Sequence, residues 1–222
     1  MSPGDLVLTP AYTWHDHQNS SDEPMTWFDG LDLPLASYLD AQFFEFYPTG
    51  ELQEPGCGGS PPPLGATPGE PSAALLYRWA ETEAVLDAAR ARPDRHDDVL
   101  HRYTNPATGG PVLPTIDATI QLLRAGVATT PHRHVHSVVY QAFRGRGETI
   151  INGVRFAWER GDMFAVPPWA VHEHHAPDDD AVLFAITDAP VLRALGLERV
   201  LSLESPQEIT AEFLPGAPHP DA

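Results

Sequence analysis

Apolar residues follow two patterns along the chain, one with a helical period and one typical of β strands. Between residues 72 and 91 the apolar positions recur at helical spacing and Pro93 follows them, so we expect a helix there. These positions are Leu75, Leu76, Trp79, Leu86 and Ala89. From Leu113 onward, short apolar stretches alternate with glycine and proline, which is typical of an all-β sandwich or barrel. A short helix is expected at 190–197, after the clearest apolar stretches, which are residues 119–123, 138–143 and 163–166.

Proline and glycine dominate a segment that separates the N-terminal residues from these two regions. This proline- and glycine-rich segment consists mainly of residues 55–71. Proline lacks the backbone donor that helices and central strands need, and glycine favours turns. We therefore expect a linker or a long loop there.

The composition limits the classes of function. A hydrophobic share of 42% over 222 residues allows one full domain, or one domain plus part of another. The formal net charge of −18 argues against nucleic acid as a partner, because phosphate binding requires a basic surface. No apolar stretch approaches the roughly 20 residues of a membrane span, no signal peptide is recognisable, and Cys57 is a single cysteine that cannot form an internal disulfide. We expect a soluble, cytoplasmic protein with no nucleic-acid or membrane partner.

An internal repeat links the first residues to the region around residue 170. Residues 3–17 align without a gap with residues 160–174, so that turn residues and two histidines coincide. The matched pairs are Gly4 with Gly161, Asp5 with Asp162, Pro10 with Pro167, His15 with His172, and His17 with His174. After a one-residue shift, residues 32–35 (Asp-Leu-Pro-Leu) resemble residues 188–191 (Asp-Ala-Pro-Val). We infer a duplication.

The second copy contains a histidine cluster that the first copy lacks. His172 follows His132 by forty residues, whereas the first-copy counterpart of His132 would precede Met1. On this interpretation the chain begins inside the first repeat, and its first site is incomplete. A truncated gene, a wrongly chosen internal start codon or a genuine loss would each produce this pattern.

Segment 131–136 (Pro-His-Arg-His-Val-His) carries histidines at alternate positions. Alternate side chains of a strand share one face, so we expect His132, His134 and His136 to point to the same side. Buried imidazoles are costly unless a metal or a hydrogen-bond partner satisfies them, and imidazole suits iron, zinc, copper and nickel alike. We predict a metal site formed by His132 and His134, with His172 from a separate strand.

The other histidines have different expected roles. His136 and His174 are predicted to be pocket residues beside the metal rather than ligands. Surface or hydrogen-bonded positions are expected for His96, His101, His175 and His219. No serine–histidine–aspartate order, phosphate-binding glycine loop or CxxC pair offers an alternative site.

Two spacings around these histidines resemble the two cupin motifs. The residues that match the first motif are Gly126, His132, His134 and Gly145, and those that match the second are Gly161, Pro167 and His172. The fold that the resemblance implies is all-β: a cupin barrel (a double-stranded β-helix, or jelly roll) with a partial second cupin and a few short helices.

The three-histidine set resembles that of the gentisate, salicylate and 1-hydroxy-2-naphthoate dioxygenases, which are bicupins whose iron is held by three histidines alone. The commonest cupin pattern adds a glutamate three or four residues after the second histidine, but Val138 and Val139 stand there. Similarity to this family extends along nearly the whole chain, at residues 13–17, 27–32, 105–115 and 194–197.

This resemblance implies an iron(II)-dependent, extradiol-type ring-cleaving dioxygenase of aromatic ortho-hydroxy acids, which uses O₂ and opens gentisate to maleylpyruvate. The substrate contacts that it implies are Tyr140, His174, His17 and Asp29, and His15 matches the third iron ligand of the incomplete first site. Tyr140 takes the place of an arginine that holds the substrate carboxylate in the first cupin of the family. Family members are usually multimers, which implies a homo-oligomer.

The resemblance also divides the chain into five parts. These are a C-terminal remnant of the first cupin (1–50), a Pro/Gly-rich linker (51–71), a helix and connecting segment (72–112), a complete second cupin (113–205) and a C-terminal tail (206–222). Two other functions stay open at this point. One is a non-catalytic metal-binding cupin that acts as a sensor or scaffold, which Tyr140 and the missing first-site strand favour. The other is a different cupin enzyme, such as an isomerase or a zinc- or manganese-dependent enzyme.

Overall fold

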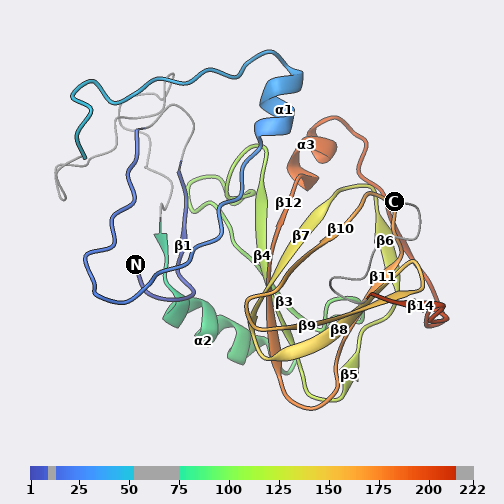
Figure 1. Cartoon of the computed structure of the whole chain (residues 1–222). Helices are drawn as coiled ribbons and strands as arrows, with labels where there is room; N and C mark the ends of the chain where they lie inside the picture. Colours follow the sequence, from blue (N-terminus) through green and yellow to red (C-terminus); the bar gives the residue numbers. More distant parts are fainter. Residues whose placement is uncertain (10–13, 53–75, 214–222) are drawn as a thin grey trace.

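Two largely antiparallel sheets curve around a common interior and form a barrel (Figure 1). The computed structural model describes residues 1–9, 14–52 and 76–213. One sheet contains, in order, β10 (Met163–Val166), β7 (Val138–Arg144), β12 (Ala181–Thr187), β4 (Asp117–Leu123) and β3 (Val99–Arg102). The other contains, in order, β13 (Val200–Ser202), β6 (His132–His134), β11 (His172–Ala176), β8 (Arg146–Ile151), β9 (Val154–Glu159) and β14 (Ala211–Glu212), with β5 (Val127–Ala128) paired to β11. From β6 to β13 the chain crosses between the sheets at every step except β8 to β9, as in a jelly roll, so the predicted all-β barrel is confirmed.

Alternate residues of β4 face two different apolar cores. Leu123 packs inside the barrel in one cluster with Leu183. Leu122 faces outward and packs in a second cluster with Leu86 of helix α2 (Trp79–Ala89). Both faces of the strand are buried, and the polar residues Asp117 and Gln121, which alternate with apolar ones along it, are buried too.

The helix predicted at 72–91 is present but starts later, as α2. Residues 72–75 lie outside the described part, and β2 (Leu76–Tyr77) pairs with β1 (Leu6–Val7). The carboxylate of Asp5 accepts a hydrogen bond from the backbone N–H of Trp79 (2.9 Å) and another from the guanidinium of Arg78 (3.0 Å). The helix therefore begins where a carboxylate distant in sequence satisfies its first N–H group.

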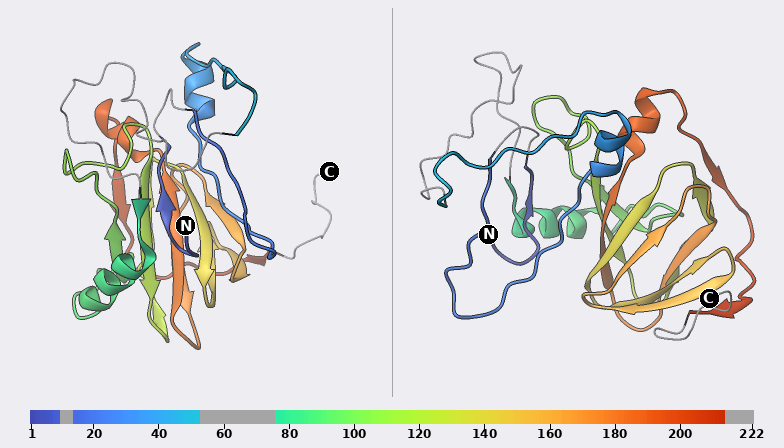
Figure 2. Two further views of the ribbon diagram at one scale, coloured as in Figure 1. Left: turned by 90° about the vertical axis from the view of Figure 1, so that its left-hand side faces the viewer. Right: turned by 45° about the horizontal axis from the view of Figure 1, so that its top comes forward.

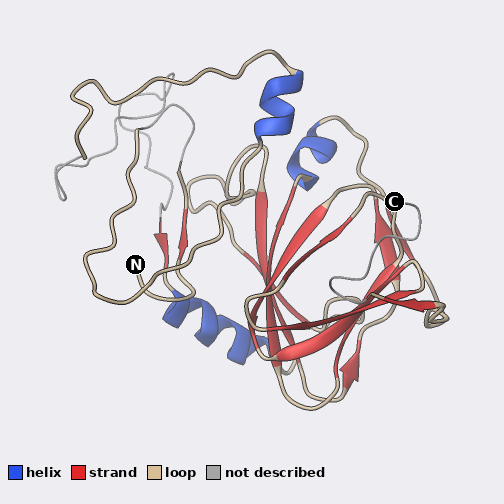
Figure 3. Ribbon diagram, in the orientation of Figure 1, coloured by secondary structure: helices blue, strands red, loops and turns tan. Residues whose placement is uncertain are grey.

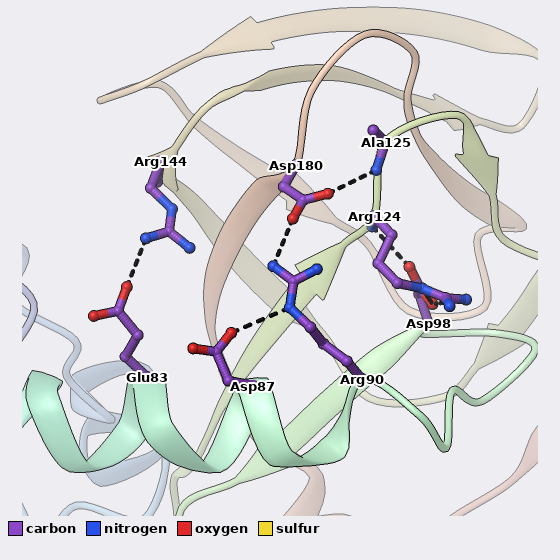
Figure 4. Close-up of polar contacts among 8 residues, drawn as sticks. All are labelled: Glu83, Asp87, Arg90, Asp98, Arg124, Ala125, Arg144 and Asp180. Atoms are coloured by element: carbon purple, nitrogen blue, oxygen red, sulfur yellow. Dashed lines mark hydrogen bonds and ion pairs between the residues drawn. The ribbon is translucent and has the colours of Figure 1, made fainter.

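Ion pairs connect α2 to the barrel, and Figure 4 shows them. Glu83 pairs with Arg144 at the end of β7 (2.7 Å). Arg90 donates to Asp180 (2.6 Å), whose other oxygen accepts the backbone N–H of Ala125 (2.9 Å). Asp180 thus joins the end of α2 to the two loops that close this end of the barrel.

The two copies of the sequence repeat have the same turn. Both glycines lie in the left-handed region, with φ +88° at Gly4 and +98° at Gly161. In each copy the aspartate N–H donates to the carbonyl three residues earlier, and the aspartate carboxylate accepts the N–H of that same residue, at 2.8–3.0 Å. The pairs are Asp5 with Ser2 and Asp162 with Glu159. This shared geometry supports the duplication.

Two short helices extend the correspondence. Helix α1 (Leu33–Tyr38) and helix α3 (Ala189–Ala194) each have six residues, an aspartate before the first residue and a proline in the first turn. The short helix predicted near 190–197 is therefore confirmed as α3. Within residues 1–9, 14–52 and 76–213, no helix has the length and apolar character needed to cross a bilayer.

Residues 14–52 run beside the barrel and, apart from α1, have no regular structure (Figures 2 and 3). Many large apolar side chains of this segment are exposed: Trp14, Met25, Trp27, Leu31, Leu33, Tyr38, Leu39, Phe43, Phe44, Phe46 and Leu52. In contrast, the equivalent second copy is part of a closed barrel. Of the predicted linker at 51–71, only residues 51 and 52 are described.

Candidate metal centre

The neighbouring strands β6 and β11 bring three histidines together, two from β6 and one from β11. His132 and His172 are direct antiparallel partners, and His134 lies two residues further along β6, on the same face. Their ring centroids are 4.2 Å (His132–His172), 4.7 Å (His134–His172) and 5.6 Å (His132–His134) apart. One ligand atom from each ring lies within 4.8 Å of the others, and all three residues are buried.

Backbone carbonyls orient two of these rings. Nδ1 of His134 lies 2.9 Å from the carbonyl oxygen of His136, and Nδ1 of His172 lies 3.1 Å from that of Ala170. A carbonyl only accepts, so each Nδ1 carries the proton and each Nε2 keeps a free lone pair. Among the described residues, the buried Nε2 of His172 and the buried Nδ1 of His132 have no hydrogen-bond partner.

Burial also keeps the three rings neutral. It lowers the pKa of His132 to about 4, with a further contribution from the nearby His96. Burial likewise lowers the pKa of His134, and it lowers that of His172 well below the usual value. Neutral imidazoles with unpaired, inward nitrogens are what a divalent metal needs from its ligands. The residues present therefore fit a three-histidine metal centre.

The fourth ligand of the commonest cupin pattern has no counterpart in this geometry. Val138 stands at the first of the two expected positions and is buried in the apolar core of the barrel. Among the described residues, the metal-compatible group of histidine, cysteine and acidic side chains consists of the three histidines. A metal held by three protein ligands keeps coordination positions open for other molecules.

His136 lies beyond the end of β6 rather than on the strand face that was expected for it. Its ring stacks on that of His134, with centroids 3.7 Å apart and an angle of 7°. Burial and His134 lower its pKa to about 3. His136 is therefore a neighbour of the three-histidine group and not a member, as predicted.

Tyr140 and His174 lie in the same interior. Both are buried, and their ring centroids are 4.9 Å apart. His174 is on β11, two residues after His172, and its ring centroid lies 5.8 Å from that of His172. Tyr140 stacks on Phe164, and burial raises the pKa of its hydroxyl, so Tyr140 stays uncharged. The structure thus brings these two predicted substrate contacts beside the histidine group.

The predicted first-copy residues form a separate, exposed group. The rings of His15 and His17 lie 5.4 Å apart, and His17 stacks on Trp27 at 5.0 Å. The indole N–H of Trp27 donates to Asp29 (3.2 Å). The structure brings His15, His17 and Asp29 together, on the segment beside the barrel, but does not bring them to the three buried histidines.

Three residues near the buried group were not singled out from the sequence as site residues. The ring of His96 lies 5.0 Å from that of His132 and is held by Thr130 and Ser202. Burial, together with Asp94, raises the pKa of Asp97 to about 6. Arg102 pairs with Asp117 at 2.7 Å. All three residues lie in or just before β3. No local sequence motif indicates that β3 pairs with β4, so the sequence did not point to these residues.

A comparison with protein-family models assigns a class to the part of the chain that carries the three histidines. The family model "Cupin domain" matches residues 119–187, which include all three histidines. The protein is therefore a cupin with a three-histidine centre of the kind that binds metals.

Similarity to known dioxygenases extends well beyond the residues that the cupin model matches. The chain is 41% identical to a 5-aminosalicylate 1,2-dioxygenase of a Comamonas species over 96% of its length, and 41% identical to a gentisate 1,2-dioxygenase of a Streptomyces species over 90%. A crystal structure of salicylate 1,2-dioxygenase from Pseudoaminobacter salicylatoxidans with gentisate superposes with a TM-score of 0.76 at 34% identity, covering 91% of this chain and 60% of that one. Over nearly its whole length the chain is similar to gentisate, salicylate and 5-aminosalicylate 1,2-dioxygenases, and it spans about 60% of the length of these relatives.

Proposed function

We propose that this chain carries the metal centre of an iron(II)-dependent, ring-cleaving dioxygenase of aromatic ortho-hydroxy acids, with gentisate opened to maleylpyruvate as the reaction. The observation that supports this most is the group of three buried, neutral histidines with free nitrogens, in a chain homologous to such dioxygenases. Both oxygen atoms of O₂ enter the product when the ring opens between the carbons that bear the carboxylate and the hydroxyl.

His132, His134 and His172 would hold the iron. Bound there, iron(II) would supply open coordination positions and electron transfer between the aromatic ring and O₂. The protein contributes orientation and a dry interior. Val138 and Phe164 contribute to the apolar core around the site, which excludes water.

Tyr140 and His174 are the proposed contacts to the aromatic acid. The uncharged hydroxyl of Tyr140 can donate to a carboxylate, although it lacks the charge of an arginine. His15 is the proposed ligand of a first metal site, with His17 and Asp29 as the proposed substrate contacts of that site. A homo-oligomer and a cytoplasmic location stay predictions from the family resemblance and the single cysteine.

The test is oxygen uptake by the purified chain after anaerobic loading with iron(II). Gentisate, salicylate and 1-hydroxy-2-naphthoate are supplied separately, and His132→Ala is the control. Uptake that the substitution abolishes would support the proposal. Stoichiometric iron without uptake for any of the three acids would contradict it.

That second result would favour a non-catalytic metal-binding cupin, a sensor or scaffold. Two observations give this alternative weight. Tyr140 offers no positive charge for a carboxylate, and His172 and His174 are completely buried. Ligand-dependent changes in partner binding or stability, without turnover, would then be the property to measure.

A further inference from the structure

A buried hydroxyl links two side chains at the wall of the candidate metal centre. Oγ1 of Thr149 lies 2.9 Å from Nε1 of Trp158 and 2.9 Å from Nδ1 of His174. The three residues come from β8, β9 and β11, and Thr149 is the direct cross-strand partner of His174. All three are buried, with Thr149 and His174 completely so.

The direction of these hydrogen bonds follows from their chemistry. The indole Nε1–H of Trp158 can only donate, so the oxygen of Thr149 accepts there. Among the described residues, the remaining partner of that hydroxyl is Nδ1 of His174. The hydroxyl proton therefore points to Nδ1, which accepts it, and the proton of the neutral imidazole is on Nε2.

The position of the indole depends on Gly147, its cross-strand partner on β8. A Cβ at Gly147 would lie 2.6 Å from the ring of Trp158 and 2.6 Å from the carbonyl oxygen of His175. Real Cβ atoms do not approach that closely, so the absence of a side chain at 147 lets Trp158 reach Thr149.

This arrangement leaves the Nε2–H of His174 as a buried donor. Nε2 has no hydrogen-bond partner among the described residues, and the rings of Tyr140 and His172 lie 4.9 and 5.8 Å from that of His174. An unsatisfied buried donor costs roughly 1–3 kcal/mol, so an acceptor is expected there when the site is in use.

We propose that Trp158 and Thr149 fix His174 in its Nε2–H tautomer, so that His174 donates a hydrogen bond to an oxygen atom of the ligand bound at the three-histidine centre. Thr149 and Trp158 are positioning residues, since they act through the ring of His174. The identity of that ligand as an aromatic ortho-hydroxy acid rests on the proposed function. The tautomer of His174 is independent of that function, because it follows from the hydrogen bonds of Thr149 alone.

The tautomer is measured by long-range ¹H–¹⁵N NMR of the metal-free protein labelled with ¹⁵N-histidine. The signal of His174 is assigned by its loss in His174→Asn. We expect the Nε2–H pattern in the native protein and in Thr149→Ser, which keeps the hydroxyl. In Thr149→Val the pattern is expected to shift toward a tautomer mixture, and in Trp158→Phe the freed hydroxyl can accept from Nδ1–H. An Nδ1–H pattern in the native protein, or an unchanged pattern in Thr149→Val, would overturn the proposal.

A binding measurement tests the use of the donor. Calorimetric titration of the iron-loaded, oxygen-free protein with gentisate should give about tenfold or more weaker binding in Thr149→Val, with Thr149→Ser close to native. Equal affinities in all three proteins would contradict a hydrogen bond from His174 to the ligand. If the native protein binds none of the aromatic acids, the proposed function fails, while the NMR result still decides the tautomer.

Discussion

His132 and His172 are direct cross-strand partners, although forty residues separate them in the sequence, and their rings lie 4.2 Å apart. Pairing between neighbouring strands fixes this distance without any contribution from loops. His134 then joins the group through the two-residue period of β6. A centre built on rigid strands in this way is set in its geometry before any metal binds.

Metal removal should lower the stability of the protein. A ligand that binds only the folded state, at about 100 times its Kd, adds roughly 2.7 kcal/mol to the free energy of unfolding. For a chain of this size we expect chelation to reduce the melting temperature by about 5–10 °C, measured by calorimetry with and without iron(II). His172→Ala should show no such difference. A chelator effect of the same size in that variant would place the metal elsewhere.

Acid should destabilise the metal-free protein at mildly low pH. The folded pKa of His132 is about 4 and that of His136 about 3, both below the usual 6.5. The unfolded chain therefore binds more protons as the pH falls below about 6.5, so the free energy of unfolding decreases toward pH 4 and the loss for His132 is complete just below that. Urea unfolding at a series of pH values tests this. His136→Asn should show a shallower slope, and a flat profile in the native protein would contradict the assigned burial.

Replacement of Asp5 should destabilise the start of α2. Its carboxylate accepts hydrogen bonds from Ser2, Trp79 and Arg78, and its side chain is almost completely buried. We expect Asp5→Ala to cost about 1–3 kcal/mol in denaturant unfolding. The matched control is Asp87→Ala, which removes an exposed ion pair and should cost about 1 kcal/mol or less. Equal effects would mean that Asp5 does not cap the helix.

A methyl group at position 147 should disturb the barrel wall. The Cβ of Gly147→Ala would clash with the Trp158 ring and with a backbone carbonyl, so we expect a loss of about 1–3 kcal/mol from overpacking. Gly110→Ala is the control, because its new Cβ would meet a side-chain oxygen of Thr108 at 3.3 Å and little else. Comparable stability of the two variants in urea would contradict the tight fit of the indole.

The sequence allowed the barrel and the histidine group to be predicted for identifiable reasons. Alternation places His132 and His134 on one face, and the match of residues 3–17 with residues 160–174 marks His172. The start of α2 was predicted too early, because the carboxylate that caps it, Asp5, lies more than seventy residues away.

Contacts between distant strands explain the remaining differences. His96 approaches His132 because Thr130 and Ser202 hold its ring, and neither contact follows from spacing. His136 lies off the strand face because β6 ends at His134, and Nδ1 of His134 donates to the carbonyl of His136 just beyond it. Such contacts depend on which strands become neighbours in the sheet. The alternation of side chains along a single strand carries no information about those neighbours.

The central claim is that His132, His134 and His172 form the metal centre, and anaerobic titration with iron(II) tests it most directly. Bound iron is counted for the native chain, for His132→Ala, for His172→Ala, and for His175→Ala as the matched control on the same strand, where the ring pairs with Glu148 instead. We predict one iron per chain in the native protein and in His175→Ala, and none at the same concentrations in the other two. Full iron binding by His132→Ala and His172→Ala would contradict the account.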